Sequence, residues 1–294
     1  MMLIAFLAQT LRIAMPYLFA SSGGVVSERG GMIALTLEGY MLIAAFTAAL
    51  GSYYAGPVAG PWVGLLTGVA GGVAAALLYG LCCIRYRANQ VVVGIAINLF
   101  AIGVTRFFLR LTFDSSSNSP RIAGFTETGT GFAALALNPL VWLGVLSLPA
   151  VGWMLFRTPF GLRLRAVGEH PDAALSVGVP VQRIRWMAVA ISGAFAGLGG
   201  TYLALDQHQF TDGMTAGRGF IAIAATIFGR WHPRLVAIAC VLFAAAETLQ
   251  IQLQGTQLVP SQFVEMIPYV LTIVALAGVV GRAVPPAALG KAES

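Results

Sequence analysis

Residues 158–185 read TPFGLRLRAVGEHPDAALSVGVPVQRIR, and this polar, arginine-rich stretch lies between two long apolar runs at residues 139–156 and 186–205. Apolar runs of about 20 residues are long enough to cross a bilayer as helices. Connections between neighbouring helices are usually short, so a basic stretch of this length predicts a folded surface element. The pattern indicates a helical membrane protein with one large loop on its cytoplasmic side.

The composition extends this interpretation to the whole chain. Of the 294 residues, 58% are hydrophobic and only 10% are charged, and the mean hydropathy is +0.83. A soluble domain carries about 25% charged residues, so this chain cannot cover a water-facing surface. At about 20 residues per span, the sequence predicts an all-α fold, a polytopic membrane helix bundle of about eight to ten spans, in a single domain over residues 1–294.

The apolar runs also predict where the chain crosses the membrane irregularly. The expected spans are residues 3–20, 31–53, 58–84, 89–111, 139–156, 186–205, 219–229, 235–253 and 262–281. Pro16 and the clusters SSGG and SERGG interrupt residues 16–40, which predicts entry in two short pieces. The run 219–229 is too short to cross alone and predicts a re-entrant half-helix, which is stable at membrane depth only inside protein or beside a water-filled cavity.

The distribution of arginine predicts the orientation. The net charge of +6 reflects the concentration of arginine in cytoplasmic loops, so we expect no nucleic-acid partner. The turn at Arg85 and Arg87, the loop 157–185 and the turn near residue 230 are expected inside, as is the carboxyl terminus. The loops 112–137 and 206–217 are expected outside, and the side of the amino terminus stays open. The first residues lack a basic region and a cleavage site, which predicts a retained span.

Several catalytic classes are excluded by missing motifs. A phosphate-binding loop requires Gly-Lys-Ser/Thr, and the one lysine, Lys291, is followed by alanine. No H-E-x-x-H motif is present, and the three histidines are too scattered for a zinc site, namely His170, His208 and His232. The cysteines show no CxxC spacing and read as small buried hydrophobes. We therefore expect no ATPase activity, no metal and no cofactor in this chain.

The loop 157–185 carries the start and stop signals of a short helix. Pro171 suits its first position, with Glu169 and Asp172 near its positive end. Residues 173–177 continue it for about two turns, and Gly178 is placed to end it. Two interpretations fit, an amphipathic turn on anionic lipid and a docking surface. The small side chains favour docking, because interfacial helices use bulky anchors.

Polar residues inside the spans form a second group of candidates, because ionisable groups in lipid are costly and usually face a cavity or a partner. Glu38 and Asn98 lie within two of the runs, while Glu247 and Gln250 share one helical face by their spacing. As a set they could line a substrate pathway, since ribose hydroxyls and nucleobase edges need acceptors and amides. The alternative is that they join neighbouring helices, or that the glutamates pair with Arg29 or Arg106.

Four segments in order give the chain a family resemblance: SERGGMIALTLEGYMLIAAF (27–46), RANQVVVGIAINLFAIGVTRFF (87–108), FGLRLRAVGEHPDAALSVGVPVQRIR (160–185) and GRGFIAIAATIFGRWHP (217–233). They resemble the permease subunits of ABC importers of the nucleoside and simple-sugar type. One departure concerns residues 34–36, Ala-Leu-Thr, where the family often has Asn-Ile-Gly or Asn-Ile-Ala. An amide is lost there, which leaves the ligand preference within the family open.

The resemblance implies a pathway-forming permease in the bacterial inner membrane, for nucleosides or alternatively for simple sugars such as ribose or galactose. A secondary transporter or channel is the alternative from another class. The implied partners are a separate ATPase, which uses the ATP, a related second permease and an external substrate-binding protein, besides membrane lipid. The loop would be the coupling element that receives the ATPase, through Gly168, Glu169, Pro171, Asp172, Ala173, Ala174 and Gly178.

Overall fold

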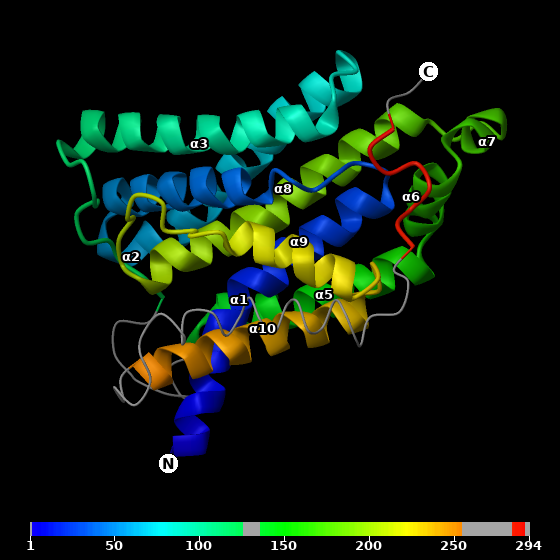
Figure 1. Ribbon diagram of the computed structural model, residues 1–294. Helices are drawn as coiled ribbons and strands as arrows, with labels where there is room; N and C mark the ends of the chain where they lie inside the picture. Colours follow the sequence, from blue (N-terminus) through cyan, green and yellow to red (C-terminus); the bar gives the residue numbers. More distant parts are fainter. Residues whose placement is uncertain (1, 126–135, 255–283, 292–294) are drawn as a thin grey trace.

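A computed structural model of the chain describes residues 2–125, 136–254 and 284–291 (Figure 1). Helices account for most of them, and the described residues contain no strand beyond one isolated bridge between Asn118 and Thr211. The all-α fold is therefore confirmed. The elements are α1 (Met2–Arg29), α2 (Leu37–Gly80), the π-helical turn η1 (Leu81–Arg85), α3 (Gln90–Phe113), α5 (Pro139–Arg157), α6 (Pro159–Glu169), α7 (Pro171–Ser176), α8 (Val181–Asp206), α9 (Arg218–Phe228) and α10 (Pro233–Gln254).

Helix α2 is a hairpin of two membrane-spanning arms. Its 44 residues would extend about 66 Å as one straight helix, twice the thickness of the hydrocarbon core. The chain turns at Gly56, whose φ of 76° is outside the helical range. The hydroxyl of Thr67 donates to the carbonyl of Thr47 at 3.0 Å, so the arms lie antiparallel. The expected separate spans at 31–53 and 58–84 correspond to these arms.

The described helices support most of the expected crossings. Six of them are long and apolar enough to span a membrane, and because α2 crosses twice they give seven crossings in the described part of the chain. Helix α9 has 11 residues and is the short element expected at 219–229. The expected span 262–281 lies outside the described residues.

The prediction of two short pieces between residues 16 and 40 is wrong. Helix α1 continues through Pro16 without interruption to Arg29. Proline is tolerated inside membrane helices because neighbouring groups satisfy the freed carbonyl. The chain breaks only after Arg29, where Gly31 has a φ of 84° and a short connection leads to α2.

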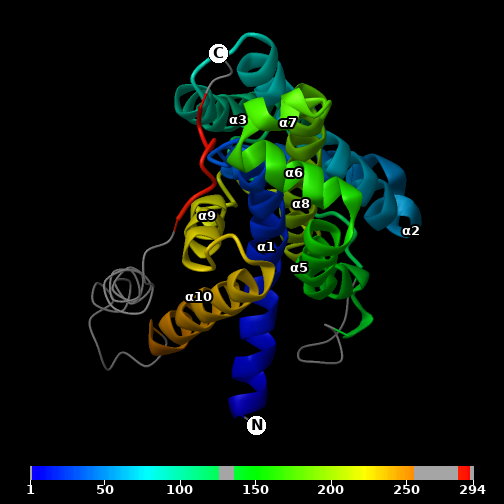
Figure 2. The same ribbon diagram turned by 90° about the vertical axis from the view of Figure 1, so that its right-hand side faces the viewer.

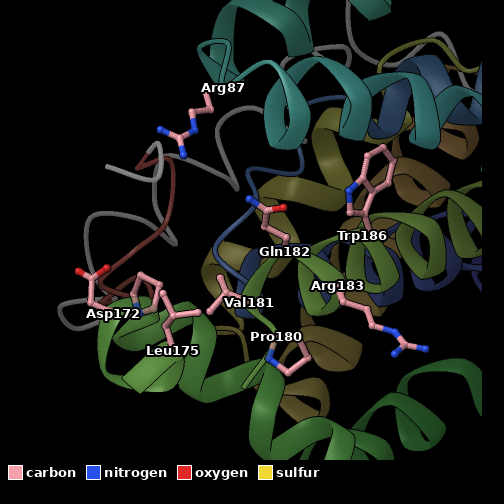
Figure 3. A pocket seen from close by; sticks show the side chains of 9 residues that line it. Arg87, Asp172, Leu175, Pro180, Val181, Gln182, Arg183 and Trp186 are labelled. Carbon is pink, nitrogen blue, oxygen red and sulfur yellow. The ribbon is translucent and has the colours of Figure 1, made fainter. Parts of the chain in front are cut away.

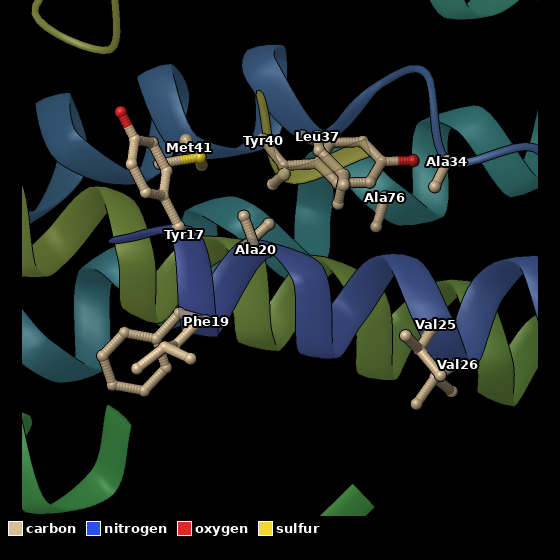
Figure 4. Close-up of a cluster of buried hydrophobic side chains, with 14 of the residues drawn as sticks. Tyr17, Phe19, Ala20, Val25, Val26, Ala34, Leu37, Tyr40, Met41 and Ala76 are labelled. Atoms are coloured by element: carbon tan, nitrogen blue, oxygen red, sulfur yellow. The ribbon is translucent and has the colours of Figure 1, made fainter. Parts of the chain in front are cut away.

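The core of the bundle lies where α1, α2 and α8 meet. Figure 4 shows Tyr17 and Ala20 of α1 on the side that faces Met41 of α2, and Phe19 and Val26 on the opposite side of α1, all fully buried.

The second arm of α2 and α8 approach each other through glycine. A Cβ atom at Gly72 would lie 2.5 Å from the carbonyl oxygen of Gly193 and 2.8 Å from the Cα of Gly197. The two backbones therefore touch, as small residues allow in lipid.

The polar segments gather at two opposite ends. Residues 81–87, 157–185 and 229–234 form the arginine-rich end, seen on the right in Figure 1. At the other end the two expected external loops pair, with Ser119 N donating to Phe210 O at 2.8 Å. The arginine-rich end is expected to face the cytoplasm. Helix α1 finishes there at Arg29, so its first turn lies at the external end.

Candidate coupling surface and transport pathway

The arginine-rich end is built from a chain of short helices. Thr158 separates α5 from α6 and accepts a hydrogen bond from Gly161 N at 3.1 Å as an N-cap. Proline then occupies the first position of α7, as expected at Pro171. The sequence analysis did not identify α6 as a helix, although the capping threonine followed by proline is a local signal for its start.

Helix α7 ends where the sequence predicted. Gly178 has a φ of 82°, and its N–H donates to Leu175 O at 2.9 Å while Val179 N donates to Ala174 O at 3.0 Å. These two bonds form a Schellman motif, which requires a left-handed residue that glycine adopts without steric cost. The geometry of the short helix is thus encoded locally, by a proline before it and a glycine after it.

Helix α7 exposes most of its surface. Asp172 and Ala173 are exposed, and the apolar side chains of Leu175 and Val177 are 62% and 77% exposed. Ala174 is the exception at 4%, because it packs into the protein core. Figure 2 shows α6 and α7 together at the end of the bundle that lies opposite the N-terminus of α1. Exposed apolar side chains at a charged, water-facing end are typical of a binding surface.

A cavity of about 760 Å³ lies beside α7 (Figure 3). Asp172 and Leu175 of α7 lie on one side, and Gln182 and Trp186 of α8 lie on the other. Arg87, at the end of the turn that follows α2, also borders the cavity. The loop 157–185 and the 85–87 turn therefore form one surface, which combines an apolar floor with charged side chains of both signs.

Gly168 and Glu169, also expected to contact an ATPase, hold α6 against the rest of the protein. A Cβ atom at Gly168 would lie 2.1 Å from the carbonyl oxygen of Arg29. Its own carbonyl accepts from Ala288 N at 2.9 Å, and the Glu169 carboxylate accepts from Ala287 N at 3.2 Å and lies 3.9 Å from Arg29. The segment 284–291 was not expected here, and its sequence carries no signal for this contact.

Glu38 caps the half-helix α9. Its carboxylate accepts from Gly217 N at 2.8 Å and from Gly219 N at 2.7 Å. The first N–H groups of a helix have no partner within the helix, and the positive end of its dipole favours a negative charge. Glu38 thus joins α2 to the beginning of α9.

Asn98 likewise forms hydrogen bonds with the backbone at the beginning of α2. Its side-chain oxygen accepts from Gly39 N at 2.9 Å, and its amide donates to Leu35 O at 2.9 Å. The side chain is buried, at 8% exposure. Asn98 therefore supplies its amide to the 34–36 segment, in which the sequence itself lacks one.

Glu247 of α10 accepts hydrogen bonds from Arg218, at 3.1 Å, and from the hydroxyl of Tyr17. Arg218 is the first residue of α9 and was not singled out from the sequence, although an arginine opening an apolar half-helix is a visible signal. Gln250 lies on the same helix and is partly exposed.

Glu38, Asn98 and Glu247 therefore meet around the beginnings of α2 and α9. All three have protein partners in this structure and join separate elements, and Glu38 and Glu247 also contact the beginning of α9. The proposed pairing of the two glutamates with Arg29 or Arg106 is not what the structure has. Arg106 instead binds Asp212 of the external loop, with Nε at 2.9 Å from the carboxylate.

The other end of α9 is fixed by a buried acid that sequence analysis missed. Glu28 is 3% exposed and accepts a hydrogen bond from the indole of Trp231, just beyond α9. Arg29 donates to Trp231 O at 3.2 Å. Because Arg29 also approaches Glu169, the end of α9 and the end of α6 share one side chain.

A membrane bundle with a partly buried half-helix and an exposed short helix at its arginine-rich end fits the class of transport permeases. The chain belongs to the family described as "Branched-chain amino acid transport system / permease component", which matches residues 6–276. It is therefore a multi-pass membrane protein of an ABC transporter family and a transport component, not an enzyme. This membership decides against a secondary transporter or channel.

The relatives cover nearly the whole chain. The guanosine ABC transporter permease protein NupQ of Bacillus subtilis (strain 168) is 38% identical over 96% of this chain and 93% of its own length. The nucleoside ABC transporter permease protein NupC of Lactococcus lactis subsp. cremoris (strain MG1363) is 35% identical over 96% and 94%. The putative glucose ABC transporter permease protein TsgC13 of Haloferax volcanii is 33% identical over 85% and 78%.

Proposed function

We propose that this chain is the pathway-forming permease subunit of an ATP-driven importer of nucleosides in the bacterial inner membrane. The observation that carries the ATP-driven part is α7, a short, capped and exposed helix at the arginine-rich end. A separate ATPase, a related second permease and an external substrate-binding protein complete the transporter. ATP is used by the ATPase, and this chain needs no cofactor of its own.

Helix α7 has the shape and chemistry of a docking element. Its exposed Ala173 leaves room for close approach, and Leu175 and Val177 offer apolar contacts that water does not satisfy. The neighbouring cavity could accept side chains of the ATPase. We infer that Asp172, Ala173 and Leu175 touch the partner, while Gly168, Glu169 and Ala174 hold the surface in place.

The linkage from α7 to the pathway follows from the contacts of α9. Arg29 connects Glu169 to Trp231 at one end of α9, and Glu38 and Glu247 hold the other end. A displacement of α6 and α7 by the ATPase would reach α9 through these contacts. Movement of α9 would release carboxylate and guanidinium groups that can bind hydroxyls and base edges.

The nucleoside preference is supported by NupQ and NupC, which are named for guanosine and nucleosides. TsgC13, named for glucose, supports a simple sugar as the second candidate. Uptake of labelled substrates distinguishes the two candidates.

The test uses proteoliposomes that contain the chain with its ATPase, second permease and binding protein. We expect ATP-dependent uptake of labelled guanosine or uridine, and no uptake with a non-hydrolysable ATP analogue. Uptake of glucose or ribose in place of nucleosides would move the assignment to the sugar importers. Uptake that continues without ATP would contradict the proposal altogether.

A further inference from the structure

A groove of about 690 Å³ runs between α5 and α10, and it includes His232 and Pro233 where α9 leads into α10. On the α5 side it is lined by Leu148, Gly152, Trp153 and Arg157. Along α5, nine residues separate Leu148 from Arg157, a distance of about 13 Å. The lining therefore changes from apolar, toward the middle of the bundle, to aromatic and then to cationic at the arginine-rich end.

The α10 side also changes from cationic at the arginine-rich end to apolar deeper in the bundle. Arg234 lies in the first turn of α10, and Ala237 follows one turn deeper. A further guanidinium, that of Arg165, lies 4.9 Å from the centre of the Phe156 ring, which is part of the groove wall. No carboxylate is among the described residues that line the groove, and neither Arg157 nor Arg234 has an ion-pair partner in the described part of the chain.

We propose that this groove binds an anionic phospholipid of the cytoplasmic leaflet. The phosphate lies between Arg157 and Arg234, and an acyl chain follows the apolar floor past Gly152 toward Leu148. Three observations fix the occupant as a lipid. The groove lies between two helices that are each long and apolar enough to span a membrane, and its lining changes from apolar to cationic along α5. Trp153, about one turn from Arg157, is 65% exposed, as is typical of tryptophans at a membrane interface. Basic pockets between membrane helices on the cytoplasmic side bind anionic headgroups.

Gly152 allows the acyl part of the site to be tested separately from the headgroup part. A Cβ atom there would lie 3.5 Å from Pro233, an ordinary contact. A leucine at this position would extend into the groove beside Pro233. Gly152→Leu should therefore exclude the acyl chain, while Arg157→Gln with Arg234→Gln should remove the attraction for the phosphate.

The experiment measures lipid binding to the full-length chain, purified in detergent, by native mass spectrometry. Dioleoyl phosphatidylglycerol and dioleoyl phosphatidylcholine are the probes. Wild type should retain phosphatidylglycerol in preference. The double arginine variant should bind it about 30-fold more weakly, as expected for two basic residues near an anionic headgroup. Arg85→Gln removes an exposed arginine at the same end but outside the groove, and should bind like wild type.

Three outcomes would overturn the proposal. Equal retention of the two lipids by wild type would show that the headgroup is not recognised. Equal weakening by Arg85→Gln and the double variant would show a general charge effect. Displacement of the lipid by millimolar inorganic phosphate, together with unchanged binding in Gly152→Leu, would assign the site to a soluble anion. A melting temperature measured for each variant separates loss of binding from loss of folding.

Discussion

At the scale of single residues, two adjacent alanines of α7 have opposite environments. Ala173 is exposed, whereas Ala174 is 4% exposed and packs into the core. From the sequence alone the two positions cannot be told apart, because both are small residues of one short helix. Only the packing of α7 on the protein distinguishes the position that can meet a partner from the position that cannot.

Arginine at these two positions should therefore fail in different ways. Ala173→Arg should leave the amount and melting temperature of the permease unchanged, but reduce ATPase binding and uptake. Ala174→Arg should destabilise the permease itself, by about 1–3 kcal/mol for overpacking and more for a buried unpaired charge. The measurements are membrane abundance, ATPase pull-down and uptake. Full transport by Ala173→Arg would show that α7 is not the coupling element.

Asn98 gives a second prediction at this scale. Asn98→Leu removes the partners of Gly39 N and Leu35 O, and each buried group left without a partner costs about 1–3 kcal/mol. We expect a lower melting temperature in detergent as well as reduced transport. Gln250→Leu, at a partly exposed position of α10, is the control and should melt like wild type. An unchanged melting temperature for Asn98→Leu would contradict its role in holding α2.

At the scale of elements, α7 depends on the residue that ends it. A residue with a Cβ atom costs about 1–2 kcal/mol in the left-handed conformation, which Gly178 adopts with a φ of 82°. Gly178→Val should therefore loosen the end of α7 and weaken ATPase binding. The bundle should be unaffected, because no atom lies within 4 Å of a Cβ built at this glycine. Pull-down and thermal melting of the same preparation check both parts.

The helices show which structural features local sequence signals can predict. Long apolar runs predicted the spanning helices, and the proline and glycine around α7 predicted its bounds, because these signals act within a few residues. The uninterrupted α1 was missed, because other helices decide whether Pro16 breaks a membrane helix. The partners of Glu38 and Glu247 were missed for a related reason, since they come from other helices, namely α9 for Glu38 and α1 and α9 for Glu247.

At the scale of the whole molecule, the chain should be inactive toward ATP. Its only lysine, Lys291, lies outside any phosphate-binding loop. The purified chain should hydrolyse no ATP above background, whereas addition of the partner ATPase should give activity that depends on α7. Turnover by a verified single-chain preparation would contradict the assignment as a permease subunit.

The contact of the second arm of α2 with α8 through Gly72, Gly193 and Gly197 has a consequence for spectroscopy. Because the two helices touch backbone to backbone, we expect their relative position to stay fixed, so the pair can serve as a reference for distance measurements. Spin labels at the exposed residues Ala74 and Met187 should give the same interlabel distance with and without ATP in the assembled transporter. Distances measured from this pair to a label at Ile227 of α9 would then report displacement of the half-helix alone.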